Sequence, residues 1–215
     1  MDRIDFKSTR SAVVVTGGAA GIGAAAAFEL ARRGAAIALV DRDAPGLAKT
    51  ARCITEAGGK VSTHTCDISD EASVLALPEA VAHCHGGAQA LLNAAGVGLL
   101  GSFRQVDLDE FRWLLEINLW GTIVACKAFL PLLSREKAAH IANVSSVYGL
   151  VAPTGRVPYS TSKFGVRGFT EGLRHECEGS AVTVGVILPG GIKTDLGLKA
   201  RIGRNVDPET GARAA

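Results

Sequence analysis

The chain has 215 residues, of which 47% are hydrophobic, and its 23 lysine and arginine residues nearly balance its 21 aspartate and glutamate residues. A chain of this size and composition buries enough apolar surface to fold as one domain, which excludes general disorder. The net charge of +2 lacks the broad basic field of nucleic-acid-binding proteins, so no nucleic-acid partner is expected.

The five cysteines are scattered and form no C-x-x-C pair, which fits neither a disulfide framework nor a zinc ribbon. These cysteines are typical of buried thiols in a reducing compartment, so we expect a cytoplasmic location. The possible metal ligands at residues 83–85 would point apart on a helix, so we expect no metal site. Residues 11–28 are uncharged for 18 residues, long enough for a membrane span. Because four glycines divide this stretch into two short apolar runs, we expect neither a membrane span nor an export signal.

Short aliphatic or β-branched runs alternate with longer helical patterns along the chain. Since parallel strands need crossover connections, this alternation predicts an α/β fold with a doubly wound, Rossmann-type parallel sheet. Ligands of such sheets lie at the carboxyl ends of the strands. The strands are expected at Ala12–Thr16, Ala36–Val40, Lys60–Thr65, Ala90–Asn93, His140–Val144 and Val182–Leu188. The helices are expected near Ile22–Arg33, Pro45–Ala57, Asp70–Cys84, Asp107–Leu133 and Pro158–Glu178.

A glycine-rich loop follows the first predicted strand, and an alanine-rich helix follows the loop. Glycine permits the tight turn and lets the backbone approach a diphosphate, while the N–H groups at the helix start bind the anion. The sequence therefore predicts a dinucleotide site, with Gly17, Gly21, Ile22 and Gly23 among its residues.

Asp41 closes the second strand, 18 residues after Gly23. A carboxylate at this spacing accepts hydrogen bonds from the adenosine ribose hydroxyls and repels a 2′-phosphate, so NAD is favoured over NADP. Arg42 leaves the choice open, because a guanidinium there could pair with that phosphate. A turn or helix-cap role is the alternative for Asp41.

Tyr159 is followed four residues later by Lys163, and these positions share one face of a helix. A cation beside a phenol favours the phenolate and lowers the pKa of the phenol. We therefore expect Lys163, helped by a positive nicotinamide ring, to move the pKa of Tyr159 towards neutrality and make it a general acid/base. A solvated helix face without a catalytic role is the alternative.

These motifs together resemble those of the short-chain dehydrogenase/reductase family, from residue 12 to about residue 195. The loop has the family pattern T-G-x-x-x-G-x-G, residues 93–96 (N-A-A-G) are similar to its N-N-A-G, and residues 189–194 (P-G-G-I-K-T) are similar to its P-G-x-x-x-T. The resemblance implies an NAD(P)-dependent oxidoreductase that transfers a hydride between the cofactor and a secondary alcohol or ketone.

The resemblance also implies roles for single residues. Ser146, thirteen residues before Tyr159, is expected to hold the substrate carbonyl, with Ser145 as the alternative. Asn118 matches the asparagine that holds a water against Lys163, and a bland surface site is its alternative. The further cofactor-binding residues implied are Asp67, Ile68, Asn93, Ala94, Gly96, Tyr159, Lys163, Pro189, Gly190, Ile192 and Thr194.

The C-terminal part departs from the family pattern. Family members continue through a substrate lid and more helices to a seventh edge strand, so we expect six strands here, without the seventh. Residues 1–194 are predicted to form the NAD(P)-binding catalytic domain, and residues 195–215 a partial lid or a tail with little packing of its own. A homo-oligomer is expected if the full-length chain is longer.

Two functions of different class stay open. The first is the oxidoreductase, and the second is a catalytically idle NAD(P)-binding interaction protein or fragment without the substrate lid. The complete catalytic set of Asn118, Ser146, Tyr159 and Lys163 favours the enzyme. We expect a small, partly apolar alcohol or ketone as substrate and no membrane partner. The expected apolar wall consists of Leu99, Leu100, Val147, Leu150, Val151 and Pro153.

Overall fold

Strands and helices alternate along the chain as the sequence pattern predicts. The computed structural model describes residues 11–192, 194 and 196–207. The main sheet contains β1 (Ala12–Thr16), β2 (Ala36–Asp41), β3 (Val61–Thr65), β4 (Ala88–Asn93), β6 (Ala139–Val144) and β7 (Val182–Ile187). The main helices are α1 (Gly21–Arg32), α2 (Ala44–Glu56), α3 (Glu71–His85), α4 (Leu108–Leu115), α5 (Gly121–Leu133) and α6 (Val157–Glu176).

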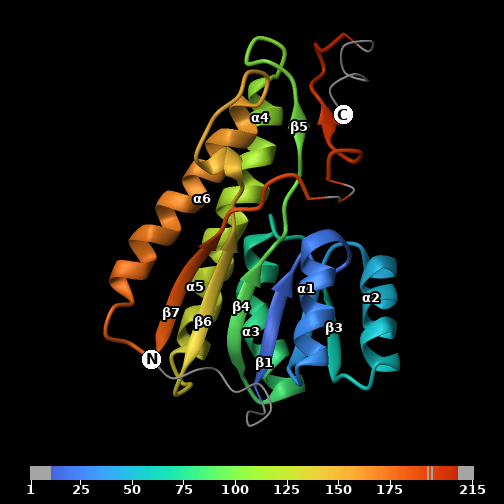
Figure 1. Cartoon of the computed structure of the whole chain (residues 1–215), viewed down its shortest axis with the longest axis vertical. Helices are drawn as coiled ribbons and strands as arrows, with labels where there is room; N and C mark the ends of the chain where they lie inside the picture. Colours follow the sequence, from blue (N-terminus) through green and yellow to red (C-terminus); the bar gives the residue numbers. More distant parts are fainter. Residues whose placement is uncertain (1–10, 193, 195, 208–215) are drawn as a thin grey trace.

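The six strands are parallel and lie in the order β3-β2-β1-β4-β6-β7. The winding reverses between β1 and β4, so the connections after these two strands leave in opposite directions and open a crevice at the carboxyl ends. Figure 1 shows the strands running side by side with helices on both faces of the sheet. This confirms the doubly wound α/β fold and the six strands of its main sheet.

Apolar side chains fill both faces of the sheet. On one face α1 and α2 pack on a core that includes Leu39 and Ile54. On the other face, a larger core beneath α3, α5 and α6 includes Phe129 and Ile141. Strand β1 is buried along its whole length because both of its faces are covered. The covered sheet holds the strand ends, and the loops that follow them, in fixed positions.

The long helix expected at 107–133 is interrupted. A π-helical turn, Glu116–Trp120, joins α4 to α5 and contains the fully buried Asn118. By length and composition alone, the run Leu108–Leu133 could cross a membrane, and half of its most apolar window is buried inside the fold. Its α5 part buries Phe129 against the sheet, as the core helix of a globular fold does.

A second, two-stranded sheet lies beyond the strand ends of the main sheet. β5 (Leu99–Leu100) pairs in parallel with β8 (Arg201–Ile202), and Figure 1 shows the C-terminal segment beside β5. Arg204 continues this contact with an ion pair to Asp109 on α4, at 2.7 Å. Residues 201–202 thus pair with a distant loop, while most of residues 196–207 are exposed, so the partial lid or tail stays a prediction. Residues 195 and 208–215 lie outside the described residues.

Candidate active site

A cavity of about 440 Å³ lies at the carboxyl ends of the main-sheet strands. This volume is typical of cofactor and small-molecule pockets. The predicted site residues Gly23, Asn93 and Asn118 are not part of its lining. The predicted residues that line it are Gly17, Gly21, Ile22, Asp41, Arg42, Asp67, Ile68, Ala94, Gly96, Ser146, Tyr159, Lys163, Pro189, Gly190, Ile192 and Thr194.

The glycine loop has the shape that a dinucleotide diphosphate requires. Gly17 has a φ of 70°, and a Cβ there would lie 2.7 Å from the backbone nitrogen of Ala95. A Cβ on Gly23 would overlap the carbonyl oxygen of Gly17, so the helix packs directly on the loop. No described side chain caps α1, and its first turn carries no acidic residue. The N–H groups of that turn are thus available for an anion.

Thr16, the first residue of the loop motif, ties the loop to the segment after β4. Its Oγ1 accepts hydrogen bonds from the backbone nitrogens of Ala94 and Ala95, both at 3.2 Å. The sequence pattern includes Thr16 as the first residue of the motif but predicts no role for it. The other lining residues that it did not assign are Ala19, Ala20, Val40, Asp43, Cys66, Ala95, Val97, Gly98, Ile117, Val144, Leu196 and Lys199.

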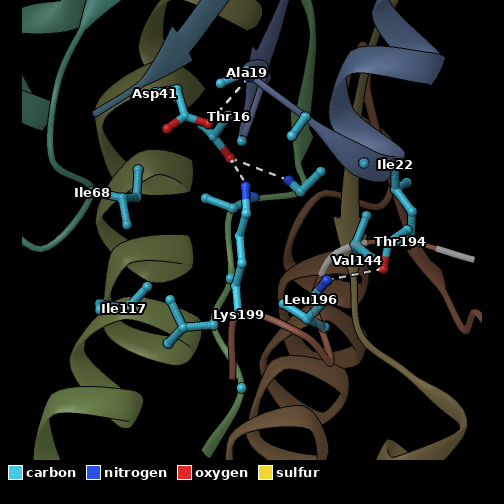
Figure 2. A pocket seen from close by; sticks show the side chains of 18 of the residues that line it. Thr16, Ala19, Ile22, Asp41, Ile68, Ile117, Val144, Thr194, Leu196 and Lys199 are labelled. Atoms are coloured by element: carbon cyan, nitrogen blue, oxygen red, sulfur yellow. Dashed lines mark hydrogen bonds between the residues drawn. The ribbon is translucent and has the colours of Figure 1, made fainter. Parts of the chain in front are cut away.

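The Asp41 carboxylate is held in place by two backbone groups. Its oxygens accept hydrogen bonds from the nitrogens of Ala19, at 3.1 Å, and Asp43, at 3.0 Å. Figure 2 shows Asp41 beside Ala19 at one end of the pocket. Arg42 forms an ion pair with another residue of the pocket, because its Nη1 lies 3.6 Å from the Asp67 carboxylate.

Tyr159, Lys163 and Ser146 meet at the other end of the pocket. The Nζ of Lys163 lies 5.6 Å from the centroid of the Tyr159 ring and donates a hydrogen bond to the Val144 carbonyl oxygen at 3.0 Å. The Ser146 side chain hydrogen-bonds the Tyr159 phenol. The positions i and i+4 on α6 and the end of β6 thus bring together a phenol, an ammonium and a hydroxyl.

Burial governs the protonation of both groups on α6. It raises the pKa of Tyr159 above its ordinary value, and the hydrogen bond from Ser146 and the charge of Arg156 oppose this only in part. Burial also lowers the pKa of Lys163 to about 8. In the protein's own groups, desolvation of the phenolate outweighs the favourable influences of Ser146 and Arg156, so the expected shift of the Tyr159 pKa towards neutrality depends on the positive nicotinamide ring and stays a prediction.

Ser145, the alternative to Ser146, is committed to the scaffold. Its buried hydroxyl donates to the backbone carbonyl of Lys163 at 2.7 Å, which joins the end of β6 to α6. Asn118 also has structural partners, because its Oδ1 accepts from the Val97 nitrogen at 2.8 Å and its Nδ2 donates to the Val97 oxygen at 3.0 Å. A Cβ on Gly96 would lie 3.3 Å from Asn118 Oδ1 and 3.7 Å from Lys163 Nζ, so these groups lie close to one another.

Asn93 belongs to a buried polar network behind the pocket. Its Nδ2 donates to Asn143 Oδ1 at 2.8 Å and lies 3.3 Å from Cys126 Sγ. This network joins β4 to β6, whose ends carry the cofactor and catalytic motifs. Asn93 thus positions the pocket floor instead of lining the cavity.

None of the six residues of the expected apolar wall belongs to the cavity lining. Leu99 is buried in a satellite core with Val106 and Leu114, Leu100 is also buried, and neither lines the cavity. Val151, in contrast, is 60% exposed.

The buried ammonium predicts a specific dependence of stability on pH. The pKa of Lys163 is about 8 in the folded protein against an ordinary value of 10.5, so the unfolded chain binds more protons between these values. We therefore expect the free energy of unfolding to rise by about 3 kcal/mol between pH 8 and 10.5 through this group. Urea unfolding of Lys163→Met, with exposed Lys49→Met as the control, should show this rise missing only from the first variant. Equal slopes in all three proteins would contradict the assignment.

Among the residues that the structure describes, no group of three or more His, Cys, Asp or Glu side chains could hold a metal. His83 and Cys84 are exposed, and His85 is buried with its Nε2 at 2.8 Å from Ser62 Oγ.

Comparisons with known proteins agree with this geometry. A family model described as short chain dehydrogenase matches residues 11–204. D-threitol dehydrogenase from Mycolicibacterium smegmatis is 38% identical to this chain. The matched region covers 91% of this chain and 75% of that dehydrogenase. A structure of a short chain dehydrogenase/reductase from Burkholderia phymatum in complex with NAD matches with a TM-score of 0.87 at 30% identity. The match covers 97% of this chain and 73% of that protein's chain. Actinorhodin polyketide ketoreductase with NADPH matches with a TM-score of 0.84 at 29% identity. The match covers 89% of this chain and 74% of that protein's chain. The chain belongs to the short chain dehydrogenases and is an NAD(P)-dependent oxidoreductase of that family.

Proposed function

We propose that the protein transfers a hydride reversibly between NAD and a secondary alcohol or ketone, with Tyr159 as the general acid/base. The observation that carries this proposal is the meeting of Tyr159, Ser146 and Lys163 at one end of a pocket whose other end holds the glycine loop and Asp41. When bound, the dinucleotide supplies the hydride chemistry, and the protein supplies position and protons.

The proton path follows from the three side chains. Ser146 donates a hydrogen bond to the substrate oxygen and fixes it near Tyr159. In the reduction direction Tyr159 gives its proton to that oxygen, and in the oxidation direction its phenolate takes the proton back. Lys163, whose pKa of about 8 leaves it mainly charged at neutral pH, stabilises the phenolate that forms.

The raised pKa of Tyr159 favours reduction at neutral pH. A phenol that keeps its proton is ready to act as an acid, whereas oxidation needs the phenolate and gains as the pH rises. The geometry therefore supports a ketone as the substrate at neutral pH and an alcohol at alkaline pH. Exposed apolar residues near the end of β6, Leu150 and Val151, support a substrate with an apolar part.

The cofactor preference for NAD rests on Asp41. Its carboxylate is held by Ala19 and Asp43, and Arg42 is turned to Asp67, so a 2′-phosphate at this end would meet uncompensated negative charge. Asp41→Asn keeps one of the two acceptor oxygens and removes the charge, and we expect the affinity ratio of NADPH to NADH to rise about tenfold. Glu79→Gln, the same kind of change on an exposed residue of α3 outside the cavity lining, is the control. Nicotinamide fluorescence titrations measure both ratios, and equal shifts in the two variants would refute the role of Asp41.

The function is tested by following NADH absorbance with purified protein and a panel of apolar ketones, and with the matching alcohols and NAD at alkaline pH. Turnover of at least one pair in both directions supports the proposal. Binding of NADH with no turnover of any pair would favour the idle nucleotide-binding protein instead. A cytoplasmic location is part of the proposal, supported by the five free cysteines. The homo-oligomer of a longer chain stays a prediction.

A further inference from the structure

The segment after β7 brings an exposed lysine to the edge of the pocket. We call residues 196–204 the strap; its members Leu196 and Lys199 both line the cavity. Figure 2 shows the Lys199 side chain extending along the pocket towards Thr16, the residue that opens the glycine loop. The chain just before the strap also meets the loop, because a Cβ on Gly21 would lie 3.7 Å from Thr194 Cγ2.

The backbone just after Lys199 is held in a fixed place. Arg201 donates its N–H to the Gly98 carbonyl at 3.0 Å, and its guanidinium stacks on the Trp113 ring at 3.7 Å. A Cβ on Gly98 would lie only 2.8 Å from the Cβ of Ala200, so the strap passes there in close contact. The direction in which Lys199 enters the pocket is thus set by backbone pairing and close packing.

The positions of the cationic side chains in the pocket give this lysine a defined role. The lysines and arginines of the described lining are Arg42, Lys163 and Lys199. Arg42 lies against Asp67, and Lys163 is buried under Tyr159 with its ammonium on the Val144 oxygen. Lys199 is the one that extends towards the glycine loop (Figure 2).

A diphosphate at the loop would gain from a positive charge beyond what the loop provides. The N-terminus of α1 contributes about half an elementary charge. Asp41 and Asp43, in the same lining, add negative charge beside it. A dianion bound there would therefore be under-compensated without a full positive charge from another segment.

We propose that Lys199 is a cofactor-binding residue whose ammonium is the counter-ion of the dinucleotide diphosphate, and that the strap holds it there through Gly98 and Arg201. This inference rests on the proposed dinucleotide site. It assigns a binding role to a segment that carries none of the motifs of the fold.

The test compares Lys199→Met, Lys199→Arg and the exposed control Lys49→Met with the unmodified protein. NADH binding is measured by nicotinamide fluorescence, and ADP-ribose and adenosine binding by calorimetry. We expect Lys199→Met to weaken NADH and ADP-ribose about tenfold, as loss of a charged hydrogen bond does, and to leave adenosine unchanged. Lys199→Arg should restore most of the affinity, and Lys49→Met should behave like the unmodified protein.

Gly98→Ala tests the strap without changing a charge. It pushes Ala200 away and should weaken ADP-ribose in the same sense while adenosine binding is kept. Unchanged NADH and ADP-ribose affinity in Lys199→Met would overturn the role of Lys199 alone, and so would equal weakening of adenosine, which indicates a packing effect. If the unmodified protein binds no NADH, the proposed dinucleotide site fails first, and this inference fails with it.

Discussion

Tyr159→Phe is expected to lower the rate of ketone reduction by about a thousandfold or more, which is the usual range for loss of a general acid. The substitution removes one oxygen and leaves the ring that packs on Tyr148, with centroids 6.1 Å apart. It also removes a buried phenol whose pKa is raised, so the fold loses no essential charge. Steady-state rates with NADH and the best ketone of the panel give the measurement.

Tyr148→Phe is the matched control, because the chain has only two tyrosines and Tyr148 is not in the cavity lining. Its activity should stay within a few-fold of the unmodified protein. Both variants should bind NADH normally and melt at similar temperatures, which separates a chemical loss from a structural one. A Tyr159→Phe protein with ordinary turnover would end the proposed mechanism, while the glycine-loop site would stand.

Gly23→Ala is expected to destabilise the protein by about 3 kcal/mol or more and to abolish NADH binding. The new Cβ would overlap the carbonyl oxygen of Gly17 and lie 2.8 Å from its carbonyl carbon. Both are backbone atoms, so the loop or α1 must move. Thermal and urea unfolding, together with NADH fluorescence, measure the two losses.

Gly168→Ala is the control for a glycine inside a helix. Gly168 is exposed on α6, and no described atom lies within 4 Å of a Cβ there. This change should instead stabilise the protein by about 0.5–1 kcal/mol, because alanine restricts the unfolded chain and favours the helix. If both substitutions had the same effect on unfolding, contact with Gly17 would not be the reason why position 23 is glycine.

The sequence pattern predicts the main sheet well because both of its faces are covered. Buried parallel strands read as continuous apolar runs, so the predicted strand Ala12–Thr16 coincides with β1 and Ala90–Asn93 misses only the first residues of β4. The pairing of Leu99–Leu100 with Arg201–Ile202 could not be predicted in this way. β8 is exposed and short, and its partner lies far away in the sequence, so no local periodicity marks it.

The sequence displays those parts of the candidate site that depend on local backbone geometry, and it does not display those that depend on tertiary burial. The glycine loop and the spacing of Tyr159 and Lys163 depend on local helix and turn geometry, which the sequence displays. The direction of the pKa shift of Tyr159 depends on how much protein surrounds the ring, which spacing does not reveal. Lys199 reaches the pocket only because a distant glycine, Gly98, lets the strap come close.

The π-helical turn at Glu116–Trp120 accommodates one residue more than an α-helical turn would. A chain shortened by a single residue here would form a straighter, more regular helix. Such a chain would keep α4 and α5 in the same phase, but it would lose the wide turn that places the Asn118 amide against Val97. The wide turn thus lets the helix include one additional residue while α4 and α5 each keep their apolar face against the protein.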